Sequence, residues 1–163
     1  MMESFSSRNT KGITLEQARD VALQAEKSRN FTPSINNITV GMSSGTSGKH
    51  GIFLVSREER RRWAGILLAR TLPTSLLKHL LIPWRPPLRI AFFLRANSNL
   101  YNTLQSRRID FVFHDLLGGT DIAIPQLNTK QPHALVAPAT VLRALAMAKL
   151  DGRLHIQPDH IIA

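Results

Sequence analysis

One short stretch of the chain concentrates the side chains and the backbone freedom that anion binding requires. From Val40 to Ser56 the sequence reads VGMSSGTSGKHGIFLVS, with Ser, Thr, Gly and Lys at its centre. Glycines permit turns with positive φ, in which successive backbone N–H groups converge on an anion. The hydroxyls add donors, and Lys49 adds a mobile positive charge. Three interpretations follow: a flexible linker, a tight hairpin or a phosphate-binding loop.

The order of these residues excludes a Walker-type phosphate loop. That motif needs a glycine, four residues and then Gly-Lys-Ser/Thr at the start of a helix. Here His50 follows Gly48 and Lys49, and a serine stands at the position of the first glycine. The apolar run after the loop, Ile52 to Val55, predicts a strand and not a helix. Composition alone favours an ordinary hairpin turn, so the choice depends on the order of the residues.

That order resembles the phosphate-binding signature of the adenylate-forming enzymes, Ser/Thr-Ser-Gly-Thr-Ser/Thr-Gly-x-Pro-Lys. In this chain His50 stands where the signature has proline, and Gly51 stands where it ends in lysine. The segments AFFLRANSNLYNTL and PHALVAPATVLRALA are similar to the phenylacetate–CoA ligase-like branch of that superfamily, which often lacks the final lysine. The matching residues of the loop are Ser43, Ser44, Gly45, Thr46, Ser47, Gly48 and Lys49.

The resemblance implies an enzyme that activates a small-molecule carboxylate with ATP and Mg²⁺. An acyl-adenylate forms, pyrophosphate leaves, and the acyl group passes to an acceptor such as coenzyme A. In this scheme residues 43–49 hold the β- and γ-phosphates of ATP, no protein nucleophile is needed, and no catalytic residue is assigned.

The resemblance also implies a domain organisation. Residues 1–13 form a loose lead-in, and residues 14–163 form part of an adenylation domain that is truncated where an apolar run begins at 161–163. The family's magnesium-side glutamate, ribose-binding aspartate and C-terminal lysine motifs are not found in this sequence. We therefore expect that the chain alone does not form acyl-adenylate. Carboxylate-dependent ATP–pyrophosphate exchange by the purified chain would refute this expectation.

The composition leaves two alternatives to this interpretation. Lys and Arg number 21 against 11 acidic residues, and a net charge of +10 attracts polyanions. A basic nucleic-acid-binding α/β module is therefore the first alternative, although nucleic acid is not favoured because only 6% of residues are aromatic. The second is a non-catalytic remnant. No apolar run approaches about 18 residues, so we expect no membrane partner, and a chain without cysteine or a secretory signal predicts a cytoplasmic protein.

Other residues with chemical potential lack the partners that catalysis or metal binding needs. His114 and Asp115 follow a predicted strand without a nucleophile nearby in the sequence, so we interpret them as a strand-end polar pair. His155 and His160 have no third ligand at metal spacing, and we predict structural or exposed roles for them. Two acidic residues that could approach Mg²⁺ are Asp110 and Asp121. No metal site is predicted.

Hydrophobic periodicity predicts alternating helices and apolar strands from about residue 38, which indicates an α/β fold with a largely parallel sheet. Thr14 with Gln17, and Ser56 with Glu59, form capping boxes at helix starts. The expected helices cover residues 14–29, 56–72, 75–82, 98–104 and 139–151, with a helical segment around Pro125. The expected strands cover residues 38–40, 52–55, 88–94, 111–113, 134–138 and 161–163. One face of the second helix is expected to carry Trp63, Ile66, Leu67 and Arg70.

Overall fold

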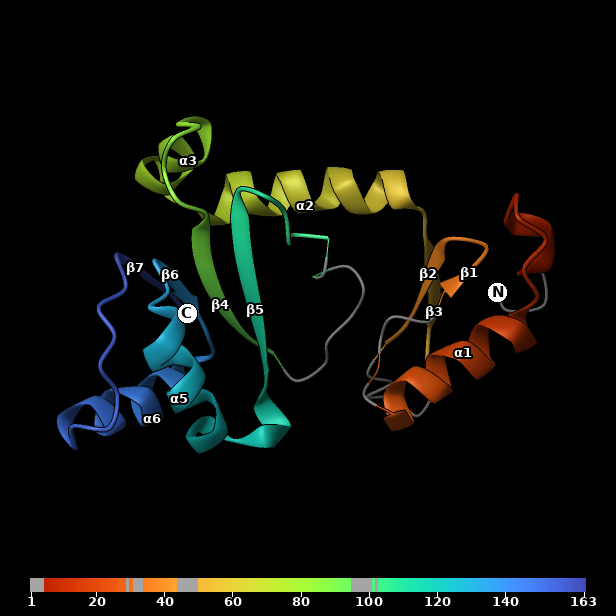
Figure 1. Ribbon diagram of the computed structural model, residues 1–163. Coiled ribbons are helices and arrows are strands. Elements are labelled where there is room, and N and C mark those ends of the chain that lie inside the picture. Colours follow the sequence, from red (N-terminus) through yellow and green to blue (C-terminus); the bar gives the residue numbers. More distant parts are fainter. Residues whose placement is uncertain (1–4, 29, 31–33, 44–49, 95–100, 102) are drawn as a thin grey trace. The chain divides into compact units, whose positions relative to one another are not determined.

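The protein is an α/β protein whose contacts divide it into two compact units (Figure 1). Unit 1 comprises residues 1–63 and 98–100, and unit 2 comprises residues 64–97 and 101–163. The computed structural model describes residues 5–28, 30, 34–43, 50–94, 101 and 103–163. The boundary between the units falls inside helix α2 (Arg57–Thr71), and each unit is described separately below.

Unit 1 consists of a short antiparallel sheet and the helix α1 (Leu15–Ser28). The strands β1 (Ser34–Ile35), β2 (Ile38–Met42) and β3 (Ile52–Val55) lie side by side in chain order. A tight turn joins β1 to β2, and both of its central residues, Asn36 and Asn37, have positive φ, which asparagine tolerates better than most residues. The sheet therefore consists of two successive hairpins.

The core of unit 1 forms where α1 packs on one face of this sheet. The buried residues of α1 recur at helical spacing as Ala18, Ala22 and Ala25, as the sequence predicts. Ala18 and Ala22 pack with Ile38 and Val40 of β2, which point to the same face because side chains alternate along a strand. The predicted capping box is confirmed at the start of α1: the Gln17 N–H donates to Thr14 Oγ1 at 3.2 Å, and the Thr14 N–H donates to Gln17 Oε1 at 3.0 Å.

Residues 5–13 carry an ordered turn built around one asparagine. A short 3-10 helix, η1, covers Ser6–Arg8. The Asn9 amide group donates to the carbonyls of Phe5 and Ile13 at 2.9 and 2.8 Å, and its oxygen accepts from the Ile13 N–H at 2.9 Å. Ile13 is 1% exposed, so this turn delivers an apolar anchor to the core of unit 1.

Helix α2 begins after the second predicted capping box, which is also confirmed. The Ser56 N–H donates to Glu59 Oε2 at 2.7 Å, and the Glu59 N–H donates to Ser56 Oγ at 3.2 Å. On the face expected to carry Trp63, Ile66, Leu67 and Arg70, Trp63 and Leu67 are half-buried, whereas Ile66 is 55% exposed and Arg70 is exposed. The buried residue is Ala64, and the half-buried residues that follow at 67, 68 and 71 continue its face at helical spacing.

Unit 2 is built on a four-stranded, wholly parallel sheet in the order β5-β4-β6-β7. The inner strand β4 runs from Leu88 to Leu94, which are the bounds that the sequence predicts. The elements that complete the unit are α3 (Thr74–Leu81), β5 (Ile109–Asp115), the 3-10 turn η2 (Leu116–Gly118), α5 (Thr120–Lys130), β6 (Ala134–Val136), α6 (Ala139–Leu150) and β7 (His160–Ile162).

The two faces of the parallel sheet carry two hydrophobic clusters. Ala91 and Phe93 of β4 point to the cluster that includes buried residues of α5 and α6. Leu88 and Ile90 of the same strand point to a second cluster with Leu76 of α3 and its neighbours. Because β4 is covered on both faces, it reads as a nearly continuous apolar run, which is typical of central strands in parallel sheets.

The structure refines several element predictions. The α/β class is confirmed, and all strands from residue 88 onward are parallel, but β2 and β3 belong to the separate antiparallel sheet of unit 1. Helix α5 begins at Thr120 and continues through Pro125. Helix α6 ends as predicted before Gly152, whose φ of +71° suits a helix C-terminus. The start of the helix expected at 98–104 lies outside the described residues, and Leu104 lies in a turn. None of the helices in the described part of the chain is long and apolar enough to cross a membrane.

Candidate functional site

The predicted phosphate-binding loop joins the two strands of the β2–β3 hairpin. Cross-strand pairing runs from Thr39 opposite Val55 to Met42 opposite Ile52, so the hairpin opens into the loop after residue 42. Ser43 lies at one end of the loop, and His50 and Gly51 lie at the other. The remaining predicted ligand residues, 44–49, lie outside the described residues.

Three hydrogen bonds close the neck of this loop, which we define as Ser43, His50 and Gly51. The Ser43 N–H donates to the Gly51 carbonyl at 2.8 Å, and the Gly51 N–H donates back to Ser43 Oγ at 2.7 Å. The ring Nδ1 of His50 lies 2.9 Å from the Ser43 carbonyl and donates to it in the tautomer that carries a proton on Nδ1. Ser43 therefore ties the two ends of the loop together.

Two glycines of the hairpin are explained by close neighbours. Phe53 lies over Gly41 in the opposite strand, and a Cβ on Gly41 would come within 2.1 to 2.8 Å of three atoms of the Phe53 ring. At the neck, a Cβ on Gly51 would lie 3.3 Å from Ser43 Oγ, which is a tight contact. Gly41 and Gly51, on either side of the motif, are thus needed for the geometry of the hairpin. The order of the residues alone did not indicate this role.

A cleft of about 490 Å³ lies near the opposite end of the same hairpin in unit 1. Its lining includes Ile38 and Leu54, the turn at Asn9–Lys11 and the first turn of α2. The charges in the cleft largely satisfy one another, since Arg62 donates to Glu58 at 2.7 Å and Glu59 is held by the capping box. The hydrogen bonds from Ser56 lower the pKa of Glu59, which is therefore a poor proton donor near neutral pH. Ser43, the one motif residue that the structure describes, does not line this cleft.

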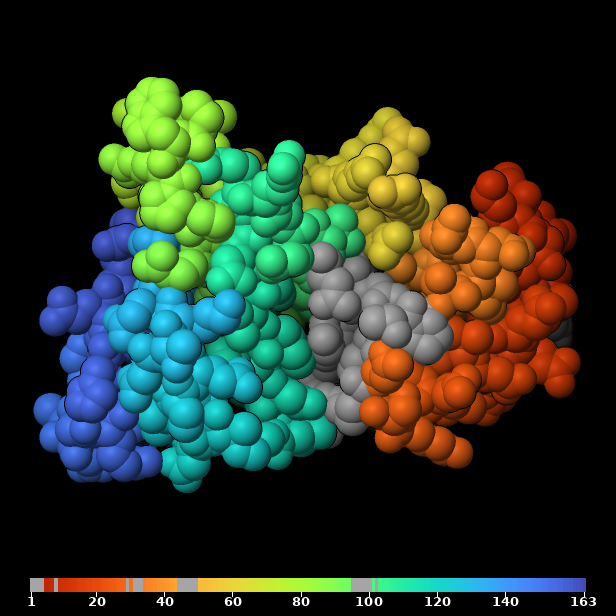
Figure 2. Space-filling view, in the orientation of Figure 1, coloured from red at the N-terminus to blue at the C-terminus, as the bar shows by residue number. Residues whose placement is uncertain are grey.

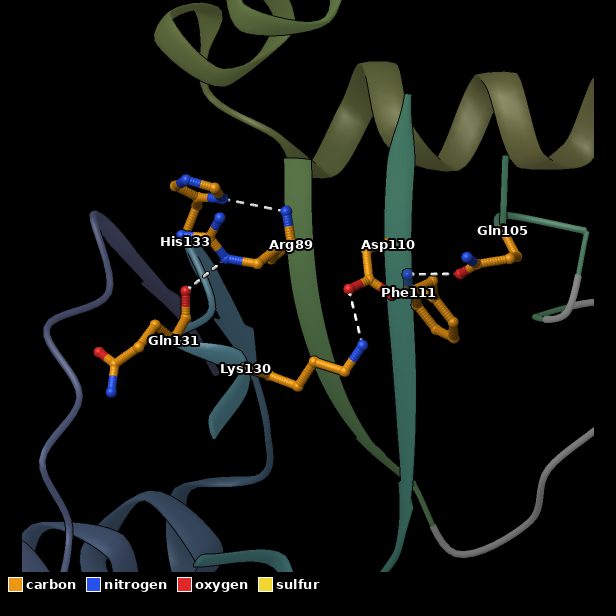
Figure 3. A network of polar contacts seen from close by, with 7 residues as sticks. All are labelled: Arg89, Gln105, Asp110, Phe111, Lys130, Gln131 and His133. Atoms are coloured by element: carbon orange, nitrogen blue, oxygen red, sulfur yellow. Dashed lines mark hydrogen bonds and ion pairs between the residues drawn. The ribbon is translucent and has the colours of Figure 1, made fainter. Parts of the chain in front are cut away.

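The acidic residues considered for Mg²⁺ are engaged elsewhere. Asp110 pairs with Lys130 at 2.9 Å, and Asp121 pairs with Arg153 at 2.8 Å (Figure 3 shows the first pair). The described residues include no group of three His, Asp or Glu side chains that could hold a metal ion.

The histidines singled out in the sequence occupy structural positions in unit 2. His114 is 6% exposed and stacks on Phe93 with ring centroids 4.6 Å apart, and burial lowers its pKa. Asp115 ends β5 and accepts from the Leu117 N–H at 3.0 Å, as expected for a strand-end polar residue. His160 Nε2 lies 3.1 Å from the Ser75 hydroxyl, which links β7 to α3.

A polar network at the start of the parallel strands was not predicted (Figure 3). His133 Nδ1 accepts from the Arg89 N–H at 2.9 Å, and the Arg89 side chain donates from Nε to the Gln131 carbonyl at 2.8 Å. Burial is the main cause that lowers the pKa of His133, and the charge of Arg89 adds to it. These hydrogen bonds fasten β4 to the start of β6. Its members lie about 40 residues apart in sequence, and no local pattern marks them.

The carboxyl ends of parallel strands are a further place where α/β proteins bind ligands. In this sheet the connections diverge between β4 and β6, so a ligand crevice would lie at their carboxyl ends. Ala137 and Pro138 follow β6, and residues 95–100 after β4 lie outside the described part. The described residues there supply little polarity, and the hairpin loop remains the better candidate.

The chain was compared with protein-family models, with curated proteins and with solved structures, and none of these comparisons finds a match.

Proposed function

We propose that the β2–β3 hairpin carries the ATP phosphate-binding loop of an adenylate-forming, phenylacetate–CoA ligase-like enzyme. The observation that supports this proposal is the closed neck, in which Ser43 bonds to Gly51 through both its N–H and its hydroxyl oxygen. A neck of this kind holds the ends of a glycine-rich loop together, and seven consecutive residues from 43 onward follow the order of the family signature. The strands β2 and β3 also flank the loop, as predicted from the apolar runs on each side of it.

The chemistry assigned to the loop is charge stabilisation. Loop N–H groups, hydroxyls and Lys49 donate to the β- and γ-phosphates, where negative charge develops as pyrophosphate leaves. An oxygen of the substrate carboxylate forms a bond to the α-phosphorus, and the bond from that phosphorus to the bridging oxygen breaks. The products are acyl-adenylate and pyrophosphate, so the protein contributes donors and position but no nucleophile.

Magnesium would enter with the nucleotide in this scheme. The described residues offer no cluster of carboxylates to hold the ion, because Asp110 and Asp121 are paired with basic side chains in different places. The loop residues alone therefore carry the proposal, and no step is assigned to a protein-bound metal.

The test is a titration of the chain with ATP, pyrophosphate and AMP, in which binding is monitored by the NMR chemical shifts of the backbone amides. We expect ATP and pyrophosphate to compete and to move the Ser43, His50 and Gly51 amides, while AMP moves them far less. Gly48→Val and Lys49→Ala should each weaken binding by roughly tenfold, since each removes loop freedom or a charged donor. Lys27→Ala, an exposed lysine of α1, is the matched control.

Two outcomes would contradict the proposal. Lys27→Ala could weaken binding as much as Lys49→Ala, which would show attraction by net charge alone. Alternatively, nucleic acid could bind with a steep salt dependence while ATP fails to compete, which would favour the basic nucleic-acid-binding module.

A further inference from the structure

The end of α3 and the turn that follows it expose two large apolar side chains three positions apart in the chain. The segment Leu81–Pro87 reads LIPWRPP, in which Leu81 is 80% exposed and Trp84 is 84% exposed. Tryptophan is rarely left so open to water, because its ring has a large apolar surface to bury. Figure 2 shows the light-green atoms of this region as a lobe on the surface of unit 2.

One arginine holds this turn in place from the inside. The Arg108 side chain donates to five main-chain carbonyls, those of His79, Leu80, Ile82, Pro83 and Arg85, at 2.5 to 3.3 Å. Two of these carbonyls belong to the last turn of α3, where a cation also meets the negative end of the helix dipole. The donors of Arg108 are thus directed into the turn, and the backbone of the turn is organised before any partner arrives.

A second contact fixes the far side of the same turn. His79 is 8% exposed, and its Nε2 donates to the Pro86 carbonyl at 2.8 Å in the tautomer with a proton on that nitrogen. The Arg85 N–H donates to the Ile82 carbonyl at 3.2 Å. Prolines at 83, 86 and 87 restrict φ and lower the entropy of the chain further. The backbone polar groups therefore face inward, and the side chains of Leu81 and Trp84 face solvent.

The sequence on both sides of this turn carries basic residues but no acidic residues. Between Glu59 and Asp110 the sequence contains no acidic residue but ten Lys and Arg residues. The rest of the chain then holds 21 − 10 = 11 basic residues and 11 acidic residues, so the whole net charge of +10 belongs to this segment. Near the turn the exposed cations are Lys78, Arg85 and Arg107. A partner for this surface must be anionic and must also accept apolar side chains.

We propose that the turn is a docking surface for an anionic lipid bilayer. This proposal departs from the expectation of no membrane partner, which rested only on the lack of a run long enough to span a membrane. Trp84 and Leu81 insert at the level of the headgroups, where an amphipathic indole ring is favoured. Lys78, Arg85 and Arg107 contact the lipid phosphates, each adding attraction that decays within a Debye length. The proposal concerns unit 2 alone and is independent of the phosphate-binding loop.

The pair of anchors favours a bilayer over a nucleic acid. A base stacks on an aromatic ring and gains little from an aliphatic neighbour, so stacking would account for Trp84 but not for the equally exposed Leu81. Insertion into lipid accounts for both side chains, since each buries apolar surface. An acidic protein partner would need a pocket that matches this turn, whereas a bilayer adapts to it.

The test is flotation of the full chain with vesicles of phosphatidylcholine, with and without about one third phosphatidylglycerol. We expect binding to the anionic vesicles only, weakened by salt, with a blue shift of tryptophan fluorescence that persists in Trp63→Phe and is lost in Trp84→Ala. Trp84→Ala and Leu81→Ala should each reduce partitioning roughly five- to tenfold, and Arg85→Glu by at least about fivefold.

Matched controls separate this surface from general stickiness. Leu150 on α6 is 82% exposed and Arg143 is an exposed cation of the same unit, so Leu150→Ala and Arg143→Glu should leave partitioning unchanged. Circular dichroism should show that all variants retain the fold. Three results would overturn the proposal. The control variants could lose as much binding as the Trp84 and Leu81 variants, or the chain could bind uncharged vesicles equally well. Alternatively, Trp84→Ala could abolish binding to RNA, to an acidic peptide or to a second copy of the chain and leave vesicle binding unchanged.

Discussion

The two sheets of this protein are held together in different ways. In unit 1 each strand pairs with the next strand in the chain, and the loop of nine residues between β2 and β3 is closed by bonds between its own ends. In unit 2 the central strand β4 is fastened to residues far along the chain, as where Arg89 meets His133. Unit 2 also packs apolar residues on both faces of its sheet, whereas the packing in unit 1 is centred on α1.

This difference separates candidate chemistry from structural support. The residues with a recognisable ligand pattern lie in a loop that is closed by contacts between its own ends. The long-range polar contacts of unit 2 instead join its strands, and the exposed side chains of Leu81 and Trp84 lie elsewhere, at the turn after α3. Substitutions in each unit can test whether this division holds.

The largest effects should come from two matched core truncations, Leu127→Ala in unit 2 and Ile13→Ala in unit 1. Leu127 is 0% exposed and Ile13 is 1% exposed, so each change removes fully buried apolar surface and leaves a cavity. We expect each to lower the free energy of unfolding by about 2–5 kcal/mol. Hydrogen exchange should show faster exchange mainly in β4–β6 for the first and in β2–β3 for the second. Equal loss of protection in both sheets for either variant would show that the two units unfold as one.

The next largest effect should come from Arg108→Met. The change removes the five hydrogen bonds that the charged Arg108 side chain donates to the turn after α3. A hydrogen bond of a charged group contributes about 1.5–3 kcal/mol to stability, but the contributions of neighbouring bonds are not additive. We expect the free energy of unfolding, measured with urea, to fall by about 2–4 kcal/mol. Arg107→Met is the matched control, because Arg107 is exposed, and its effect should stay within about 0.5 kcal/mol. Similar losses in both variants would remove the distinction between the two arginines.

Much of the fold could be predicted from the sequence because its signals are local. The two capping boxes span three residues each, and the strands 52–55 and 88–94 were predicted with their observed bounds. The face that α2 buries was harder to predict from the sequence, because it depends on which residues pack against the helix. Pro125 was ambiguous because proline starts some helices and interrupts others, and here the helix continues through it.

The functional residues divide in the same way. The loop motif could be found from residue order, and the role of Ser43 in closing the neck needed the register of β2 against β3. The role of Arg108 could not be predicted, because its five acceptors lie 23 to 29 residues away and are main-chain atoms that leave no mark in the sequence. The absence of acidic residues between 59 and 110 is a signal that was available in the sequence and bears on the exposed turn.

A smaller, pH-dependent effect should come from the buried histidines of unit 2. Burial lowers the pKa of His114, so below the ordinary histidine pKa of about 6.5 the unfolded chain binds a proton that the folded chain does not. The free energy of unfolding should therefore fall as the pH drops through that value, and it should be constant above it. His133, whose pKa is also lowered, contributes in the same direction.

His114→Phe isolates one of these contributions. The new ring can keep the stack on Phe93 but binds no proton, so the stability of unit 2 should depend less on pH below about pH 6.5. Urea unfolding at several pH values measures the slope, and His155→Gln, at an exposed histidine of the same unit, should leave it unchanged. An unaltered slope in His114→Phe would show that this residue is already open to protons in the folded state.

The smallest effect on stability should come from Ser43→Ala, and it bears most directly on the hairpin. The change removes the acceptor of the Gly51 N–H but keeps the bond from the Ser43 N–H to the Gly51 carbonyl. Because the neck is exposed, water can replace the lost partner, and we expect a cost of at most about 1 kcal/mol with faster exchange of the Gly51 amide. Ser43→Thr retains the hydroxyl and should protect that amide as the wild type does. If the hydroxyl mainly closes the neck, Ser43→Ala should weaken pyrophosphate binding far less than Lys49→Ala, whereas an equal loss would place the Ser43 hydroxyl on the phosphate itself.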